Sequence, residues 1–589
     1  MSTPYDARPW LRFYPAGVPA GVEVPDVPLT RLLDKTAARF PRRRALVFFG
    51  RTISYRRLVK AVDRFAGALR SLGVHKGDRV ALVLPNCPQV VIAFYGTLRR
   101  GAVVVMNNPL YTAPELHHQL ADSGARVVVV LDKMYETLAE ALPGTHVEHV
   151  LVTSLTEYLP RTKRLALKLP LARVRALRAE LTTPVPAEAD VISFREMLRS
   201  IRGSHRQIPV DPRYDLAALQ YTGGTTGRPK GAMLTHRNLV ANAYQTAAFD
   251  PQIRPGKEVG LAVLPLFHVF GLTMCLTAGV LIGATVVLIP KFDLDLVLAA
   301  MRRSRPTIFP GVPPIYHQIA EHPQARKFRM GSVRTCVSGA MKLPRETVDA
   351  VRKATGAQVI QGYGLTETSP VAMANPVDGN ARHVSVGIPI PGTDARVVDE
   401  NDPMKAVPVG MAGELIIRGP QVFEGYWRQP QETAEVLRNG WVRTGDIGLM
   451  SPDGFFTLID RKRDVIIVDG LNVYPSEVEA ELCRHPEVLD AAVVGVPDAL
   501  HGEAIKAYVI PQPGLDPPRP QELVELCARG LSRYKVPRYV EFRSELPRNM
   551  LGKVLRRVLR DEAAASMPRN PAHSPRPAGR PTPGHRSPP

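Results

Sequence analysis

The sequence predicts an α/β protein in which a large N-terminal region is followed by a small α+β domain. Apolar strand-like runs alternate with helix-like runs at the interval of parallel βαβ units, first over residues 79–131 and again over residues 216–361. Short strands separated by Gly and Pro turns then occupy residues 382–458, which indicates a β-rich, barrel-like subdomain. After residue 460 the pattern becomes compact and mixed, as in a separate small domain.

In the first α/β unit, glycines mark the ends of the helices. Gly101 and Gly124 follow the two helix-like runs, and glycine readily takes the left-handed conformation at a helix end. We therefore expect strands at residues 79–84, 102–106 and 126–131, and helices at residues 88–99 and 113–122.

The second α/β unit repeats this rhythm, so two α/β subdomains are predicted. Residues 259–290 contain no Asp, Glu, Lys or Arg, but Pro265 and several glycines interrupt them, and a spanning helix needs about 20 apolar residues. A buried helix followed by a buried strand fits better. We expect strands at 216–221, 284–289, 307–309, 333–337 and 358–361, and helices at 236–248, 294–303 and 344–354.

The remaining elements complete a predicted division into residues 1–460, 461–565 and 566–589. Strands of the β-rich subdomain are expected at 384–388, 395–398 and 413–417. The C-terminal domain should hold strands at 465–468, 491–496 and 505–510, and helices at 475–484, 521–530 and 553–565. The last segment has eight prolines and four arginines without apolar periodicity, so a disordered tail is expected.

The composition predicts a globular protein with more than one core, because 45% of its 589 residues are apolar and 22% are charged. A formal net charge of +21 favours anionic partners such as nucleotides or anionic lipid, although free use of Arg accounts for part of it. The five cysteines have no zinc spacing, and residues 1–19 carry no apolar secretory segment. A reduced cytoplasmic setting is therefore expected.

Residues 159–181 interleave leucines with basic side chains. Such a run usually forms a solvated helix face. It could also rest on anionic lipid headgroups, where each basic residue contributes about 1 kcal/mol. The basic residues are Arg161, Lys163, Arg164, Lys168, Arg173, Arg175 and Arg178.

Residues 221–231, Tyr-Thr-Gly-Gly-Thr-Thr-Gly-Arg-Pro-Lys-Gly, form the stretch around which we expect the chain to be organised. Glycines let backbone N–H groups approach a ligand, threonine hydroxyls add donors, and the lysine adds positive charge. This combination suits a polyphosphate, although the stretch matches neither the P-loop nor the G-x-G-x-x-G template. The candidate ligand-binding residues are Thr222, Gly223, Gly224, Thr225, Thr226, Gly227 and Lys230.

A second motif, residues 361–368, follows an apolar strand, at the edge where open parallel sheets bind ligands. Its glycines would let a flat ring approach the backbone, and its tyrosine offers a face for stacking. The threonine can donate to a phosphate, and the carboxylate is an oxygen ligand of the kind that Mg²⁺ prefers beside phosphates. The candidate residues are Gly362, Tyr363, Gly364, Thr366 and Glu367.

Other candidate residues have ordinary interpretations when read alone. Asp446, in Thr-Gly-Asp, could cap a turn, and the charged run 460–464 could be a solvated linker. Lys553 lies near the end of the chain, where a lysine is normally exposed. His268 lies in an apolar run, where a histidine is more often a hydrogen-bonded core residue.

Together these motifs resemble those of the acyl-adenylate-forming superfamily, which includes acyl-CoA synthetases, luciferases and peptide-synthetase adenylation domains. The resemblance runs from about residue 27 to residue 565 and is closest to the bacterial long-chain fatty-acid CoA ligases. Gly224 and the phrases at residues 106–111 and 470–475 are typical of that branch. The resemblance implies that the C-terminal domain is mobile.

The resemblance also implies roles for single residues. Glu367 would be the magnesium ligand, His268 would position the acyl carbonyl, and Arg463, where relatives commonly have Lys or Asp, would be the hinge. Coenzyme A would contact Gly470 and Lys535. The implied catalytic residues are Lys553, Thr366, Glu367 and His268. The implied ATP- and AMP-binding residues are Thr222, Gly223, Gly224, Thr225, Thr226, Gly227, Lys230, Gly339, Ala340, Gly362, Tyr363, Gly364, Asp446 and Arg461.

The predicted reaction is ATP-dependent activation of a medium-to-long-chain fatty acid to acyl-AMP and then to acyl-CoA, with ATP, Mg²⁺ and coenzyme A. Lys553 would serve the first half, and rotation at Arg463 would bring Gly470 in for the second. A fatty-acyl-AMP ligase, an aryl-acid CoA ligase and a non-catalytic basic polyanion-binding protein are the alternatives. No nucleic-acid partner is expected, whereas a homodimer and peripheral contact with the inner face of an anionic membrane stay open.

Overall fold

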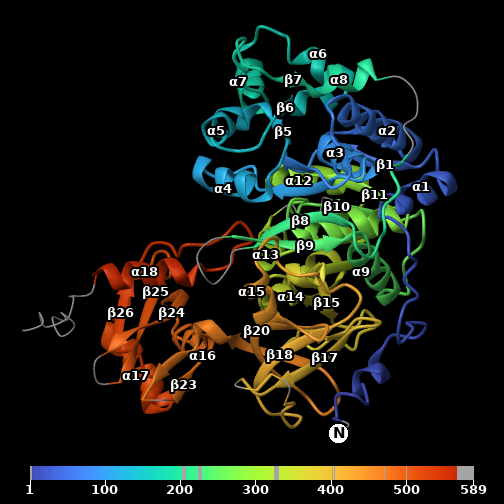
Figure 1. Cartoon of the computed structure of the whole chain (residues 1–589). Coiled ribbons are helices and arrows are strands. Elements are labelled where there is room, and N and C mark those ends of the chain that lie inside the picture. The colour runs from blue at the N-terminus through green and yellow to red at the C-terminus, as the bar shows by residue number, and fades with distance from the viewer. Residues whose placement is uncertain are drawn as a thin grey trace, which may run out of the picture. The chain divides into compact units, whose positions relative to one another are not determined.

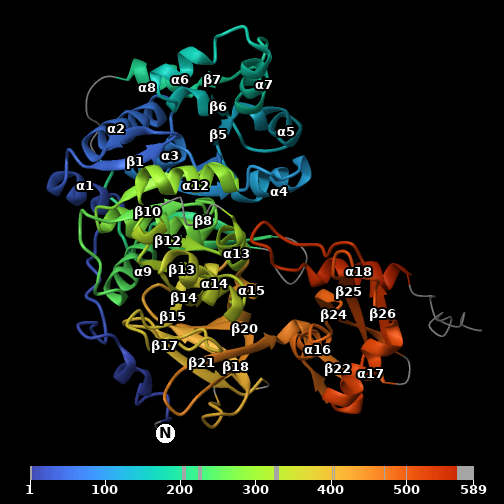
Figure 2. The same ribbon diagram turned by 180° about the vertical axis from the view of Figure 1, so that it is seen from behind.

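The computed structural model describes residues 3–201, 207–222, 229–323, 330–400, 402–403, 405–469, 471–498 and 501–566. The chain divides into two compact units, Met1–Arg463 and Asp464–Pro589, here called unit 1 and unit 2 (Figures 1 and 2). The sequence places a domain boundary after residue 460, and the division in the structure falls after residue 463.

The first sheet of unit 1 has seven strands in the order β7-β6-β5-β3-β4-β8-β9, all parallel except for the antiparallel pair β8 and β9. As the apolar pattern predicts, α3 (Pro88–Arg99) and α4 (Ala113–Ser123) connect strands of this sheet, and every residue of α3 is buried. The strands are β3 (Arg79–Val83), β4 (Val103–Asn107), β5 (Val127–Leu131), β6 (His149–Thr153), β7 (Ile192–Ser193), β8 (Leu216–Thr222) and β9 (Lys230–Thr235).

The second sheet of unit 1 has nine strands in the order β16-β15-β14-β13-β12-β10-β11-β1-β2. Two of them come from the N-terminus, since the hairpin of β1 (Arg44–Phe48) and β2 (Arg51–Ser54) adds to β11. The other strands are β10 (Val259–Ala262), β11 (Thr285–Leu288), β12 (Ile308–Gly311), β13 (Thr335–Ser338), β14 (Gln358–Gly364), β15 (Val371–Ala374) and β16 (Ile388–Pro389). The sequence predicted a strand at 384–388, but only Ile388 of that range lies in a strand.

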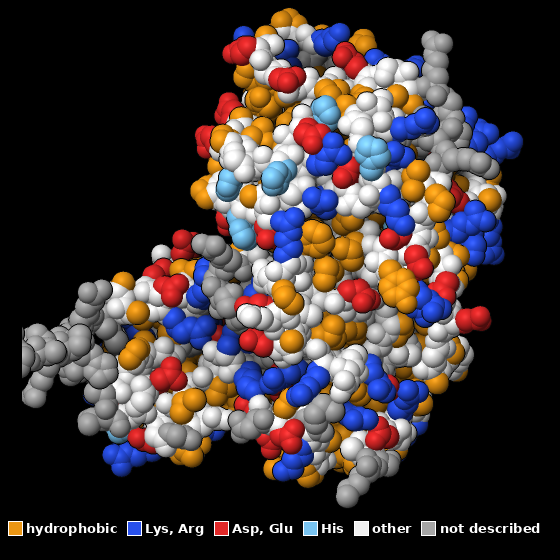
Figure 3. All heavy atoms as spheres, in the orientation of Figure 1, with side chains coloured by type: hydrophobic (Ala, Val, Ile, Leu, Met, Phe, Trp, Pro, Cys, Tyr) orange, Lys and Arg blue, Asp and Glu red, His pale blue; other side chains and the backbone are white. Residues whose placement is uncertain are grey.

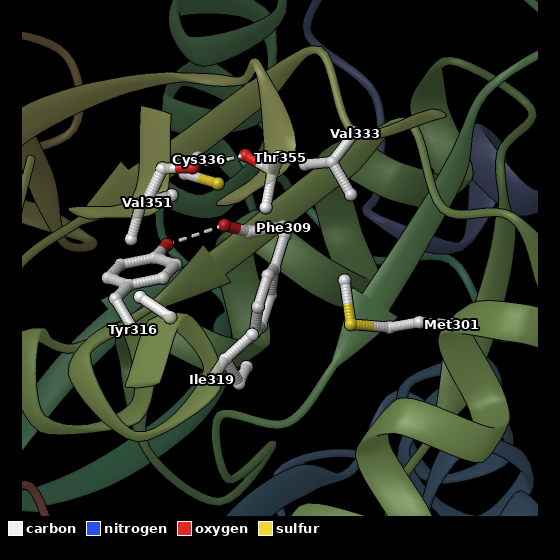
Figure 4. Close-up of a pocket in the computed structure, with 9 residues that line it drawn as sticks. Met301, Phe309, Tyr316, Ile319, Val333, Cys336, Val351 and Thr355 are labelled. Atoms are coloured by element: carbon white, nitrogen blue, oxygen red, sulfur yellow. Dashed lines mark hydrogen bonds between the residues drawn. The ribbon is translucent and has the colours of Figure 1, made fainter. Parts of the chain in front are cut away.

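One face of this sheet is covered by α12 (Leu294–Ser304), α13 (Pro313–Glu321) and α14 (Arg345–Thr355), whose apolar side chains form one core with it. Figure 4 shows a void between them, lined by Phe309, Tyr316 and Cys336 among others. The Tyr316 hydroxyl donates to the Phe309 carbonyl at 2.6 Å. The void measures about 10 Å³, so it holds at most one water molecule and is a packing gap.

The uncharged stretch 259–290 folds as strand, helix and strand. Between β10 and β11 lie α10 (Val269–Gly271), a π-helical turn η4 (Leu272–Thr277) and α11 (Ala278–Leu281). The predicted buried helix and strand are thus present, preceded by a further strand. Among the described residues, no helix combines the length and the apolar character needed to cross a bilayer.

The β-rich part of unit 1 is a five-stranded antiparallel sheet in the order β17-β18-β20-β19, with β21 beside β20. Its long central strand reaches the residues predicted to bind the nucleotide. The strands are β17 (Asp394–Val398), β18 (Gly413–Arg418), β19 (Leu437–Arg438), β20 (Trp441–Met450) and β21 (Phe456–Arg461), and α15 (Pro430–Val436) precedes β19.

Unit 2 is an α+β fold with its own five-stranded sheet in the order β23-β22-β25-β24, with β26 beside β25. The strands are β22 (Ile466–Val468), β23 (Leu471–Val473), β24 (Val488–Asp498), β25 (Gly502–Pro511) and β26 (Tyr539–Phe542). The helices are α16 (Pro475–Leu482), α17 (Pro520–Gly530) and α18 (Arg556–Ser566). The helix predicted from residue 553 therefore begins later, and the predicted tail lies, apart from Ser566, outside the described residues.

A buried histidine makes the stability of unit 1 sensitive to acid. His236 begins α9 (His236–Phe249), is 1% exposed, and accepts a 3.2 Å hydrogen bond at Nδ1 from the backbone N–H of Leu29. Burial lowers the pKa of His236 from 6.5 to about 4. The unfolded chain therefore binds a proton at a higher pH than the folded chain, so stability falls as the pH drops from 6.5 towards 4.

We expect His236 to contribute about 3 kcal/mol to this loss of unfolding free energy. Urea unfolding at neutral and at mildly acidic pH measures it, with His236→Asn as the comparison. The asparagine does not titrate, and its amide oxygen can accept from the same backbone N–H. The variant should lose less stability on acidification than the native protein, and equal losses would contradict the assignment.

Candidate active site

A buried carboxylate, Asp446, connects the five-stranded sheet with the nine-stranded sheet. It lies on β20 and is 4% exposed. Its Oδ2 accepts a 2.6 Å hydrogen bond from the Tyr363 hydroxyl on β14, and its Oδ1 lies 2.6 Å from Nε of Arg461 on β21. Burial and the neighbouring carboxylate raise the pKa of Tyr363, which therefore stays protonated as the donor. Three of the predicted nucleotide-binding side chains thus meet.

Glu367 and Lys230 approach the same side chain, Tyr426. Glu367 lies in a 3₁₀ turn, η7 (Thr366–Thr368), and its Oε1 accepts a 2.6 Å hydrogen bond from the Tyr426 hydroxyl. The ammonium group of Lys230 lies 5.4 Å from the centre of the Tyr426 ring and pairs with Glu432 on α15. Lys230 is only 6% exposed. The predicted metal ligand and the predicted phosphate-binding lysine therefore share one polar cluster.

The sequence did not single out Tyr426 and Glu432. They follow the β-rich subdomain's first strands, and Glu432 is 202 residues from its partner Lys230. The neighbouring letters Gly-Tyr-Trp carry an aromatic pair that would also suit a core. The antiparallel bridge between Ala232 and Tyr426 and the backbone hydrogen bonds beside it bring this segment next to β9.

The strand before the motif at 361–368 is longer than the predicted strand 358–361. β14 continues through Gly364, because residues 362–364 pair with β15, which runs antiparallel to it. Gly364 is required by close packing, since a Cβ there would lie 1.7 Å from the carbonyl oxygen of Pro370. Thr366 and Glu367 follow directly, so the strand and the short turn together present them.

The ends of the predicted phosphate loop are held together. Thr222 ends β8, Lys230 begins β9, and the two residues are paired across the antiparallel ladder. The loop residues Gly223, Gly224, Thr225, Thr226 and Gly227 lie outside the described residues. Lys230, predicted within the loop, is thus a strand residue, buried at the base of the connection.

His268 and Gly339 meet through Phe270. The backbone N–H of Phe270 donates to His268 Nδ1 at 3.2 Å, and a Cβ on Gly339 would lie 2.9 Å from the Phe270 ring. Burial lowers the pKa of His268 to about 4, so its imidazole is neutral near pH 7. Ala340 follows Gly339 with a positive φ of 67° and is exposed. The predicted nucleotide-binding residues Gly339 and Ala340 therefore lie in one neighbourhood with the residue predicted to position the acyl carbonyl.

Asn86 fixes the loop that carries His268, a role that no sequence pattern indicated. Its side-chain nitrogen donates to the carbonyls of Ala262 and Leu264, at 3.0 and 2.8 Å. Its side-chain oxygen accepts from the N–H of Leu266 at 2.7 Å. An asparagine after β3 of one sheet thereby holds the segment after β10 of the other.

In unit 2, Lys553 lies on a tight loop and not on a helix. Arg548 and Val554 form a β-bridge, and the Asn549 side chain accepts from the backbone N–H of Lys553 at 2.9 Å. Gly552, with φ of 83°, takes the left-handed conformation that this loop needs.

The residues predicted to act in the second half-reaction are Lys535, Gly470 and Arg463. Lys535 lies in η9 (Arg533–Lys535) and pairs with both carboxylate oxygens of Glu477, at 2.8 and 2.7 Å. Gly470 lies outside the described residues. Arg463 is the last residue of unit 1 and is exposed.

Comparison with known families matches both units of the chain. The model of the AMP-binding enzyme family matches residues 33–427, and the model of the AMP-binding enzyme C-terminal domain matches residues 477–553. The first match includes Lys230, His268 and Glu367, and the second includes Lys535 and Lys553, whereas Asp446, Arg461 and Arg463 lie between the two matches.

Individual proteins are similar over nearly the whole chain. A long-chain-fatty-acid–CoA ligase of Bacillus subtilis is 40% identical over 556 residues, which covers 94% of this chain and 98% of that protein. A feruloyl-CoA synthase of an Amycolatopsis species is 36% identical and covers 89% of this chain and 97% of that protein. The crystal structure of ATP-bound MatB from Rhodopseudomonas palustris superposes with a TM-score of 0.78 at 30% identity, covering 91% of this chain and 99% of that one.

Proposed function

Because this chain belongs to the AMP-binding enzyme family, we propose that it joins a medium-to-long-chain fatty acid to coenzyme A at the expense of ATP, releasing AMP and pyrophosphate. The 40% identity to a long-chain-fatty-acid–CoA ligase, over almost the full length of both chains, supports a fatty acid as substrate. The reaction has two halves, formation of the acyl-adenylate and transfer of the acyl group to the thiol.

The single observation that carries the nucleotide assignment is the buried cluster of Asp446, Tyr363 and Arg461. A carboxylate offers about four lone-pair sites, so two remain for ribose hydroxyls after Tyr363 and Arg461 are paired. The cluster lies where β14 ends, at the carboxyl edge of parallel strands that open α/β sheets use for ligands. We propose that this carboxylate holds the ribose and that Gly339 and Ala340 pack on the adenine.

Glu367 suits magnesium by its chemistry. Mg²⁺ is usually held by one or two carboxylates, with phosphates and water as its other ligands. Among the described residues, no group of three or more His, Cys, Asp and Glu could hold a metal alone, which fits an ion shared with ATP. Bound there, the ion would offset the charge of the phosphates. Thr366, beside it, is proposed to donate to the α-phosphate.

Lys230 is proposed to exchange one anion for another. In the structure its ammonium group pairs with Glu432. ATP phosphates would replace the glutamate, and the buried lysine would be paired in both states. This matters because a buried charge that loses its partner costs about 3–5 kcal/mol.

The first half-reaction brings together two anions, a carboxylate and ATP. Lys553, Lys230 and the donors of the phosphate loop are proposed to supply positive charge where negative charge builds in the transition state. Burial lowers the pKa of His268 to about 4, which makes its imidazole a weak base near pH 7, so we assign it to orienting the acyl group by a hydrogen bond rather than to proton abstraction. The second half needs access for coenzyme A, and rotation of unit 2 about Arg463 is proposed to provide it, with Gly470 and Lys535 contacting coenzyme A.

Asp446→Asn tests the ribose assignment. The amide oxygen can still accept from Tyr363, but the charge that attracts Arg461 and strengthens ribose hydrogen bonds is lost. We expect kcat/KM for ATP to fall about 10- to 100-fold, chiefly through KM, as for a charge-assisted hydrogen bond. Asp394→Asn is the matched control, since Asp394 lies in the same sheet and pairs with Arg418 at 2.9 Å. Equal effects of the two substitutions would refute the assignment.

A substrate series tests the function itself. The purified protein is given ATP, Mg²⁺ and coenzyme A with fatty acids of increasing length and with aromatic acids, and thioester and pyrophosphate are measured. We expect thioester from the fatty acids, with kcat/KM rising up to about fourfold for each methylene that the pocket buries. Adenylate that accumulates in the presence of coenzyme A would identify an acyl-AMP ligase, and turnover of aromatic acids alone an aryl-acid ligase. Salt-sensitive polyanion binding without pyrophosphate release would indicate a non-catalytic protein.

Two further partners are proposed. Peripheral contact with an anionic membrane would bring the protein to its substrate, because long acyl chains partition into bilayers. A homodimer is the other, and sedimentation at several protein concentrations would detect it.

A further inference from the structure

Residues 161–181 expose leucines on the body of unit 1, and neither α6 (Arg161–Ala166) nor α7 (Ala172–Leu181) contains a buried residue. Among the described residues, fifteen large hydrophobic side chains are exposed, and four of them lie between residues 165 and 177. They are Leu165, Leu169, Leu171 and Leu177, with exposed fractions of 70%, 50%, 58% and 47%. Such a concentration of apolar side chains in water marks an interaction surface.

The same segment, here called the α6–α7 surface, is strongly basic. Between residues 161 and 181 there are seven Lys and Arg residues and one acidic residue, Glu180. Figure 3 shows hydrophobic side chains among basic and acidic ones at the end of unit 1 that carries α6 and α7 in Figure 1, and the sequence of the segment itself supplies the excess of bases. An anionic partner with an apolar interior would match both kinds of side chain.

The α6–α7 surface is attached to the fold. Leu167, 8% exposed, and the partly buried Val174 pack on the main core of unit 1. The ammonium group of Lys133 donates to the last carbonyls of α7, those of Ala179 and Glu180, at 3.1 and 2.9 Å. Leu167 and Val174 thus face the core, whereas the four exposed leucines face solvent.

We propose that the α6–α7 surface docks unit 1 on an anionic lipid bilayer. Basic side chains near such a bilayer are attracted to its headgroups, and leucines between them can enter the acyl boundary. Nucleic acid would satisfy the charges and leave the leucines in water. A second copy of the same surface would bring its seven cations against seven others.

The proposal rests on the proposed function for its purpose, since a fatty acid dissolved in the bilayer is reached most directly by an enzyme on that bilayer. Its physical basis is the composition and exposure of the α6–α7 surface. Lipid binding is therefore measured without turnover, and acyl-CoA synthesis from a soluble medium-chain acid is measured separately.

The charge variant is Arg173→Gln, Arg175→Gln and Arg178→Gln together. Its binding is compared with that of the native protein by co-sedimentation with vesicles of phosphatidylcholine containing about one third phosphatidylglycerol, where each base contributes roughly a fivefold attraction. We expect partition of the charge variant to fall about 100-fold. Arg345→Gln, Arg352→Gln and Lys353→Gln, three exposed bases of α14, remove the same charge elsewhere and should change binding less than about threefold.

The leucine variant is Leu165→Gln, Leu169→Gln and Leu171→Gln together, which keeps every charge. Its partition should fall at least about tenfold, because glutamine side chains do not enter the acyl boundary. A purely electrostatic contact would be unchanged by these substitutions. The control is Leu489→Gln with Leu515→Gln, two isolated leucines of unit 2 that are 51% and 54% exposed. Since all these side chains are exposed, the melting temperatures of the variants should match that of the native protein.

Each of four binding results overturns the proposal. Equal binding of native protein and charge variant would place the contact elsewhere, and equal binding to pure phosphatidylcholine would remove the anionic part. Loss in the charge variant but not in the leucine variant would leave a simple polyanion site. Failure of native protein to bind vesicles, with self-association that the leucine variant abolishes, would make a second copy the partner. If the native protein makes no acyl-CoA, the proposed function is contradicted, and the measured binding to vesicles still supports the docking surface.

Discussion

Lys553→Ala is expected to slow formation of the acyl-adenylate by at least about 100-fold, the effect typical of removing one preorganised donor. The same substitution should spare formation of the thioester from supplied acyl-adenylate and coenzyme A, because no pentavalent phosphorus is then formed. Pyrophosphate release measures the first half, and thioester production from synthetic acyl-adenylate measures the second. The expected signature is a large loss in one half-reaction alone.

The loop that carries Lys553 fits the role proposed for this lysine. Asn549 and the left-handed Gly552 hold the Lys553 backbone in a tight loop, which the β-bridge between Arg548 and Val554 closes. A lysine on a short, braced loop can be inserted into a site and withdrawn as one piece. Arg557→Ala, which removes an exposed cation at the second residue of α18, is the control and should leave both halves unchanged. A loss shared equally by both halves would refute the role proposed for Lys553.

Arg463→Pro is expected to show the opposite signature, with adenylate formation kept and thioester formation reduced by at least about 100-fold. Proline fixes φ near −65° and removes a backbone N–H, so it should hinder the rotation proposed between the half-reactions. The position is the last residue of unit 1, where the chain passes to the separately folded unit 2. Acyl-adenylate should accumulate on the variant when coenzyme A is supplied.

Arg463→Ala is the companion of the proline variant. It removes the same side chain and keeps the freedom of φ, so both half-reactions should continue at native rates. If the alanine variant also fails in the second half, the side chain and not the backbone is responsible. If the proline variant keeps both rates, the pivot lies at another residue of the 460–464 run.

Local sequence patterns predicted the elements that local forces decide. Apolar periodicity gave α3 and its flanking strands, and the glycine after α4 takes the left-handed φ of 62° expected of a helix end. The same reasoning misplaced the start of α18 and ended β14 too early. In both places the outcome depends on contacts outside the segment, the bridge from Arg548 to Val554 and the pairing of β14 with β15.

The sequence by itself determined which chemical groups this protein holds: the Gly/Thr stretch with Lys230, the acid Glu367 and the carboxylate Asp446. Only the tertiary structure decided that Tyr426 contacts both Lys230 and Glu367. It also decided that Glu432 forms an ion pair with this lysine and that Asn86 supports the loop of His268. Periodicity records which face of an element is apolar, whereas these meetings depend on strand order and register between distant segments.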